Sequence, residues 1–117
     1  MSMTAQEAIA WVDERLHNTC SQREKLRWLA QAEDMVRALH ARCGRNPPTE
    51  PVTGDTVLLA QGAFEGLYTH YLEAQLHYAS QEYLKFNNAM ALYSNLWQEY
   101  ANFIRRGSPG QGKRRFF

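Results

Sequence analysis

The chain has 117 residues, enough to bury one hydrophobic core and too few for the large doubly wound or barrel enzymes. Hydrophobic residues make up 44% and charged residues 21%, which excludes a wholly disordered chain. No apolar run reaches the roughly 18 residues that a membrane span needs, and the first residues lack the pattern of a signal peptide. Cys20 and Cys43 match no zinc-binding or Cys-x-x-Cys spacing, so we expect reduced thiols in a cytosol.

The net charge of +1 is unevenly distributed along the chain. Residues 1–56 hold seven Lys/Arg and eight Asp/Glu, residues 57–104 hold one and four, and residues 105–117 hold five and none. A solvated globular surface usually mixes both signs, so this distribution indicates that the C-terminal segment meets another molecule.

The first half of the chain predicts two helices that form a hairpin. Thr4 and Glu7 have the spacing of a capping box, as do Ser21 and Glu24, and Gly44 is a typical residue just beyond a helix end. Apolar residues recur every three or four positions: Ala5, Ala8, Ile9, Val12 and Leu16 in the first helix, which ends near residue 17, and Leu26, Leu29, Ala32, Val36, Leu39 and Cys43 in the second.

A proline-rich loop is expected over residues 44–56, where Pro47, Pro48 and Pro51 remove backbone donors and disfavour helix. The loop is interpreted first as a crossover between two helical halves. A functional loop is the alternative, because unstructured connections of this length are uncommon in compact domains.

Residues 57–104 contain no proline and predict helix throughout, with a break at residues 79–82 because one helix of that length would not fit a compact domain. Ser80 is the expected N-cap of the last helix. Two apolar seams favour antiparallel packing. They are Ala60, Phe64, Leu67, Tyr71, Ala74 and Tyr78, widened by Tyr68, Leu72 and Leu76, and then Tyr83, Phe86, Met90, Tyr93, Trp97, Tyr100 and Ile104.

The predicted fold is therefore all-α, a bundle of about four helices over residues 1–106 with an extended tail over residues 107–117. No nucleophile elbow, phosphate loop or His-Glu-x-x-His motif is present, so we expect neither an enzyme nor a cofactor. His70, Glu73 and His77 share a helical face, but two turns separate the imidazoles and no fourth ligand is evident. The favoured interpretation is that no metal binds there.

Tyrosines are concentrated on the last two predicted helices. Tyrosine suits positions where its ring packs on apolar groups while its hydroxyl contacts water, including subunit interfaces. These tyrosines could therefore belong to the core or to an interface. The interface candidates are Tyr68, Tyr71, Tyr78, Tyr93 and Tyr100.

The basic-aromatic tail has three interpretations: an inert terminus, a nucleic-acid arm, or a docking peptide. Docking is favoured because a purely electrostatic arm has no use for exposed phenyl rings. The candidate partner-binding residues are Arg105, Arg106, Lys113, Arg114, Arg115, Phe116 and Phe117.

Residues 57–106 resemble the head-tail connector proteins of tailed bacteriophages, also called adaptor or head-completion proteins. The resemblance is carried by the Leu-Tyr-x-x-Tyr-Leu-x-Ala-Gln run at residues 67–75 and the Phe-Asn-Asn-x-Met-Ala-Leu run at residues 86–92. Related sequences often carry an Asn-Gly turn between these runs, whereas this chain has Ser80 and Gln81.

The resemblance implies a non-catalytic, all-α virion protein of the phage neck, made in the host cytoplasm. Such a protein forms a homo-oligomeric ring, a dodecamer by resemblance, beneath the portal protein. It extends the DNA channel used in genome packaging and ejection without binding DNA specifically, and it contacts the next, stopper-type neck protein. A C-terminal segment commonly docks on the portal. The alternative is a small helical nucleic-acid-binding or regulatory protein that uses the basic arm.

Overall fold

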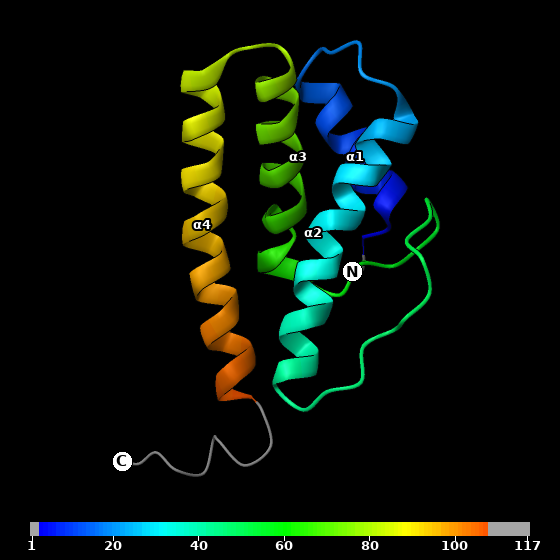
Figure 1. The fold of residues 1–117 in the computed structure, drawn as a ribbon, viewed down its shortest axis with the longest axis vertical. Helices are drawn as coiled ribbons and strands as arrows, with labels where there is room; N and C mark the ends of the chain where they lie inside the picture. The colour runs from blue at the N-terminus through cyan, green and yellow to red at the C-terminus, as the bar shows by residue number, and fades with distance from the viewer. Residues whose placement is uncertain (1–2, 108–117) are drawn as a thin grey trace.

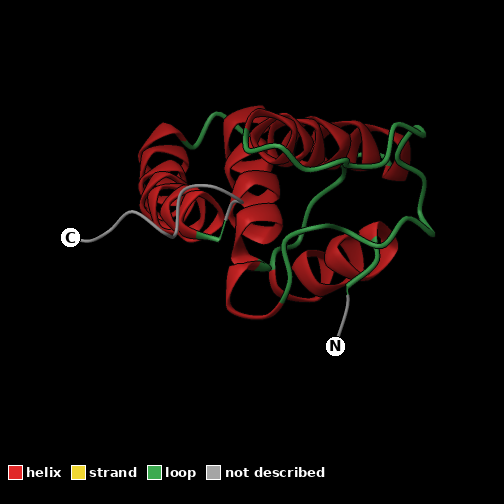
Figure 2. Ribbon diagram, turned by 90° about the horizontal axis from the view of Figure 1, so that it is seen from below, coloured by secondary structure: helices red, strands yellow, loops and turns green. Residues whose placement is uncertain are grey.

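The computed structural model describes residues 3–107, and this part of the chain is all-α, as predicted. Its helices are α1 (Ala5–Arg15), α2 (Gln22–Arg42), α3 (Gly66–Ala79) and α4 (Tyr83–Arg106), with one 3-10 turn at Gly62–Phe64. Loops join them, and the residues described form no strand (Figure 2). In Figure 1, α3 lies between α4 on one side and α1 and α2 on the other.

The predicted capping box at Thr4 forms at the start of α1, whereas at the start of α2 only the Ser21 half of the predicted box forms. The Thr4 hydroxyl accepts from the Glu7 backbone N–H, and the Glu7 carboxylate accepts from the Thr4 N–H. Ser21 caps α2 by accepting from the Glu24 N–H at 3.1 Å. The apolar stripes face the core as expected, with the following residues buried: Ala5, Ala8, Ile9 and Val12 from α1, and Leu29, Ala32, Val36 and Leu39 from α2.

The central helix α3 is buried on two sides, since it packs against α4 as well as against α1 and α2. Its apolar residues therefore surround the helix instead of forming one stripe. Those that are buried are Leu67, Tyr68, Leu72, Ala74 and Leu76. Packing on both sides makes α3 the helix around which the single core is built.

The outermost helix, α4, runs antiparallel to α3 (Figure 1), in agreement with the two predicted seams. Tyr93, Tyr100 and Ile104 of its seam are buried, and Phe86, Met90 and Trp97 are partly buried. Tyr83 is 53% exposed, so the seam begins one step later than the sequence predicts.

The turn between α3 and α4 lies where the sequence predicts a break, but Ser80 has a different role there. Ser80 is the C-cap of α3 instead of the N-cap of α4, which is Glu82. Gln81 adopts a left-handed conformation with a φ of 61°, while the Glu82 N–H donates to the His77 carbonyl and the Gln81 N–H to the Tyr78 carbonyl. These two bonds define a Schellman motif, which here uses glutamine in place of the usual glycine.

The prediction of helix from Val57 onward is wrong, because residues 57–61 are not helical and the chain bends at residues 59–60. Val57 pairs with Thr4 in an isolated antiparallel bridge, and the Leu58 N–H donates to the Met3 carbonyl at 2.9 Å. The predicted seam residues Ala60 and Phe64 therefore precede α3 instead of belonging to it. Long-range backbone pairing prevails here over a segment that is locally compatible with helix.

The proline-rich loop forms the crossover from α2 to α3, packed on the bundle. The first amides of α1 have no partner within their own helix, and the loop supplies carbonyls for them. The N–H groups of Ala5 and Gln6 donate to the carbonyls of Thr56 and Gly54. Arg37 of α2 donates to the Glu50 carbonyl at 2.6 Å.

Candidate functional site

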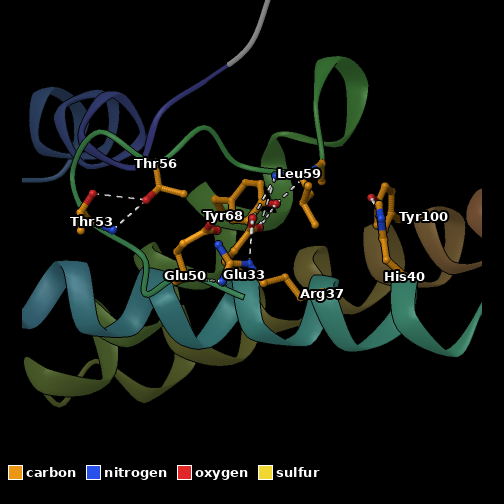
Figure 3. Close-up of polar contacts among 10 residues, drawn as sticks. Glu33, Arg37, His40, Glu50, Thr53, Thr56, Leu59, Tyr68 and Tyr100 are labelled. Carbon is orange, nitrogen blue, oxygen red and sulfur yellow. Dashed lines mark hydrogen bonds and ion pairs between the residues drawn. The ribbon is translucent and has the colours of Figure 1, made fainter. Parts of the chain in front are cut away.

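Glu33 is the centre of a buried polar cluster between α2, α3 and the end of the loop (Figure 3). The Tyr68 hydroxyl donates to Glu33 Oε1 at 2.6 Å, and the Leu59 N–H donates to Oε2 at 3.1 Å. The Ala60 N–H donates to the Tyr68 hydroxyl at 2.9 Å. Arg37 Nε lies 3.8 Å from Oε2. These contacts hold the backbone of residues 59–60 against both helices.

The electrostatics of this cluster favour a structural role. Burial raises the pKa of Glu33 against the opposing effects of the Tyr68 and Leu59 hydrogen bonds and the Arg37 charge. Burial, followed by the negative charge of Glu33, raises the pKa of Tyr68 far above its usual range. Because the Glu33 side chain has no exposed surface, no substrate reaches it in this structure. We assign the cluster to positioning the loop.

A second buried charge ties α1 to α2. Lys25 is 3% exposed, and its Nζ contacts Asp13 Oδ1 at 2.8 Å. Asn18 donates to the same oxygen and Gln22 to the other. Burial is the strongest single influence on the pKa of Asp13 and acts to raise it, but the three hydrogen bonds together lower that pKa. The Asp13 carboxylate therefore accepts from three side chains, which supports an ion pair whose lysine is buried.

His40 and Tyr100 join the far end of α2 to the far end of α4 (Figure 3). His40 Nε2 lies 2.6 Å from the Tyr100 hydroxyl. Burial, followed by the charge of Arg45, lowers the pKa of His40, which favours its neutral form. Burial raises the pKa of Tyr100 to about 12. The two rings form one wall of a surface hollow of about 330 Å³.

The end of α2 places Arg45 on this hollow. Gly44 has a φ of 82°, its N–H donates to the Ala41 carbonyl, and the Arg45 N–H donates to the His40 carbonyl. This is a second Schellman motif, and it fulfils the role predicted for Gly44. The left-handed residue reverses the chain direction, so that Arg45 returns to the mouth of the hollow.

Four arginines lie on the last turns of α2 and α4 or just beyond them: Arg42, Arg45, Arg105 and Arg106. Figure 1 shows these two helix ends side by side. Cations at helix C-termini are favoured by the helix dipole. None of the four forms an ion pair with a carboxylate among residues 3–107.

The residues weighed as a metal site form two separate pairs. His70 Nδ1 lies 3.6 Å from Glu73 Oε1, while His77 Nδ1 lies 3.1 Å from Glu82 Oε1 across the α3–α4 turn. Within residues 3–107, no three His, Cys, Asp or Glu side chains are grouped to hold a metal ion.

The five candidate interface tyrosines fall into two groups. Tyr68, Tyr93 and Tyr100 are buried within the chain's own core, so their burial argues against a subunit contact. Tyr71 is half-buried, and its hydroxyl donates to Gln31 at 3.0 Å. Tyr78 is 55% exposed and packs on Tyr83 and Phe86. In this structure Tyr78 offers the most open ring of the five to a second subunit.

The candidate docking residues lie at or beyond the end of α4. Arg105 and Arg106 are exposed in its last turn, so the helix extends two residues past the predicted end at Ile104. Gly107 is the C-cap. The other candidates lie outside the described residues: Lys113, Arg114, Arg115, Phe116 and Phe117.

Two features of the site were not predicted from sequence. Glu33 follows Leu29 by four positions and precedes Val36 by three, so it lies on the apolar stripe of α2. His40 continues the same spacing after Val36. In both cases a polar residue occurs at the spacing of the buried apolar residues, and this pattern could have indicated a buried, hydrogen-bonded side chain.

The comparisons with known proteins gave no match among family models, curated proteins or solved structures. In the part of the chain that the structure describes, no helix is long and apolar enough to cross a membrane.

Proposed function

We propose that the chain is a structural virion protein, the adaptor of a tailed-phage neck, which holds the portal protein through its C-terminal segment. The observation that carries the proposal is the continuity of α4 with the basic-aromatic segment. The helix runs from Tyr83 to Arg106 and ends in two exposed arginines. Three further cations and two phenylalanines follow in the sequence. Arginine and aromatic residues are typical anchors of protein interfaces.

The proposed ring, a dodecamer by resemblance, requires two different lateral surfaces, because closed cyclic assemblies use heterologous contacts. The outer face of α4 is one candidate, since Leu84 is 76% exposed and Leu92 is 53% exposed. Residues 57–104 carry a net charge of −3, which suits the wall of a channel through which DNA passes without being bound. The next, stopper-type neck protein would occupy another face.

Binding of the purified chain to the portal ring tests the proposal. We expect deletion of residues 107–117 to weaken binding at least about tenfold in a sedimentation or surface-plasmon assay, because the proposed anchors are lost. Unchanged helicity by circular dichroism would show that the bundle is intact. Undiminished binding by the truncated chain contradicts the docking role.

A second experiment separates the contribution of the phenyl rings of Phe116 and Phe117 to portal binding from the contribution of the positive charges. At high salt, exposed ion pairs are screened. Under that condition, we expect Phe116→Ala combined with Phe117→Ala to weaken portal binding more than neutralising Lys113, Arg114 and Arg115. The reverse order would point to an electrostatic arm.

The unpaired arginines at the ends of α2 and α4 favour a second candidate function, a nucleic-acid-binding protein that uses its basic end. Each phosphate neutralised adds about −0.9 to the slope of log K against log salt on duplex DNA. Tight duplex binding with a steep slope would favour this alternative, whereas weak, shallow binding favours the adaptor.

A further inference from the structure

The hollow between the ends of α2 and α4 has the character of a binding site. The short segment before α3 completes it, so three parts of the chain contribute to its walls. Leu59, Phe64, Tyr100 and Phe103 supply apolar or aromatic surface, while His40 and Arg45 supply polar groups. At about 330 Å³ it is at the small end of ligand pockets and suits one large side chain.

The aromatic wall is preformed and open to solvent. The Phe64 ring centroid lies 5.0 Å from that of Tyr100 and 5.2 Å from that of Phe103. Tyr100 is held in place by His40, yet Phe103 remains 51% exposed. A rigid wall with an exposed phenyl ring is the arrangement into which a partner's apolar side chain packs as an anchor.

The arginines around the hollow indicate that the partner carries negative charge. Arg45 lines the hollow, and Arg42, Arg105 and Arg106 lie on the same end of the bundle. No carboxylate among residues 3–107 forms an ion pair with any of these four arginines. An acidic partner would meet guanidinium groups without a carboxylate partner around an apolar centre, which is the usual arrangement of a protein interface.

We propose that this hollow docks an acidic peptide segment of a partner protein, with one aromatic or aliphatic side chain in the hollow and flanking carboxylates on Arg45 and the helix-end arginines. The chain's own residues 108–117 are disfavoured as the occupant because they carry Lys113, Arg114 and Arg115. The proposal does not depend on the phage assignment.

Geometry favours a peptide over a single-stranded nucleic acid. The planes of Phe64 and Phe103 are inclined at 38°, and those of Phe64 and Tyr100 at 63°. Successive bases stack on open, flat ring faces, whereas inclined rings form a concave wall for one side chain.

The test uses the full chain labelled with ¹⁵N and a synthetic peptide, acetyl-Gly-Glu-Glu-Phe-Glu-Glu-Gly-amide, titrated at low salt. We expect saturable chemical-shift changes at the amides of Leu59, Phe64 and Phe103. Replacing the peptide's glutamates by glutamine, or its phenylalanine by alanine, should each weaken binding about fivefold or more, the effect of losing one interface anchor.

Variants of the chain locate the site. Arg45→Ala and Phe103→Ala should each weaken binding about fivefold or more. Arg23→Ala is the matched control, since Arg23 lines a separate surface hollow with Ser21, Glu24 and Arg27, and it should leave affinity unchanged. Phe103 is half exposed, and if its variant unfolds, Arg45→Ala decides alone.

Several outcomes overturn the proposal. They are the absence of saturable shifts, shifts confined to other surfaces, and full affinity in both hollow variants. Stronger binding of a thymidine oligonucleotide with the same shifts would reassign the surface to nucleic acid. Shift changes at Leu59 and Phe64, which are distant from the deletion in sequence, on removal of residues 108–117 alone would make the chain's own tail the occupant.

Discussion

The hydroxyl of Tyr68 donates a 2.6 Å hydrogen bond to the carboxylate of Glu33, and neither side chain is accessible to solvent. The same hydroxyl accepts from the Ala60 N–H, so one phenolic oxygen joins α2, α3 and the non-helical segment before α3. The contact spans 35 positions in sequence, and with the bond from the Leu59 N–H to Glu33 it holds the backbone of residues 59–60 against both helices.

Tyr68→Phe tests the strength of this junction. Removing the hydroxyl leaves both Glu33 and the Ala60 N–H short of a buried partner, and each loss costs about 1 to 3 kcal/mol. We expect the free energy of unfolding in urea to fall by about 2 to 4 kcal/mol. Tyr71→Phe is the control, because its hydroxyl contacts only an exposed Gln31, and it should cost less than about 1 kcal/mol. Equal costs would contradict the assigned role.

The contributions of Glu33 and Asp13 to the free energy of unfolding should change with pH in opposite directions. The pKa of Glu33 is raised by burial, so the folded chain keeps a proton that the unfolded chain loses near pH 4.5. Wild-type stability relative to Glu33→Gln should therefore fall as pH rises above that value. The hydrogen bonds to Asp13 lower its pKa despite burial, so wild-type stability relative to Asp13→Asn should fall as pH drops below 3.8.

Urea unfolding of the wild type and both variants, from pH 7 down to about pH 3, measures these differences. Each variant serves as the control for the other, because the two slopes have opposite signs. A Glu33 difference that grows with rising pH in favour of the wild type would show that its folded pKa is lowered instead.

The left-handed backbone of Gln81 predicts that glycine is preferred there. A non-glycine residue in this conformation costs about 1 to 2 kcal/mol, so Gln81→Gly should raise the free energy of unfolding by about 1 kcal/mol. The same change at Gln98, an exposed position inside α4, should lower it by about 1 kcal/mol. A loss of stability at both positions would show that the turn does not impose this strain.

The bundle was predictable wherever local chemistry decides the structure. The capping box at Thr4, the N-cap at Ser21, the helix end at Gly44 and the spacing of the α4 seam each depend on residues within about two turns. Such local features can be identified in the sequence, and the tertiary structure does not change them. The break between α3 and α4 was expected on other grounds, because one helix over residues 57–104 would not fit a compact domain. It was placed correctly, although Ser80 ends one helix instead of beginning the next.

The candidate sites required the tertiary structure because their partners are far apart in sequence. His40 and Tyr100 are 60 positions apart, yet His40 Nε2 lies 2.6 Å from the Tyr100 hydroxyl oxygen. Arg45 and Phe103 come from opposite halves of the chain and line one hollow. The sequence alone therefore determined the helical class, the capping and the apolar faces, through short-range hydrogen bonds and periodicity. Only the packing of the helices and the loop against one another decided which polar groups became buried, since burial depends on every element that covers a residue.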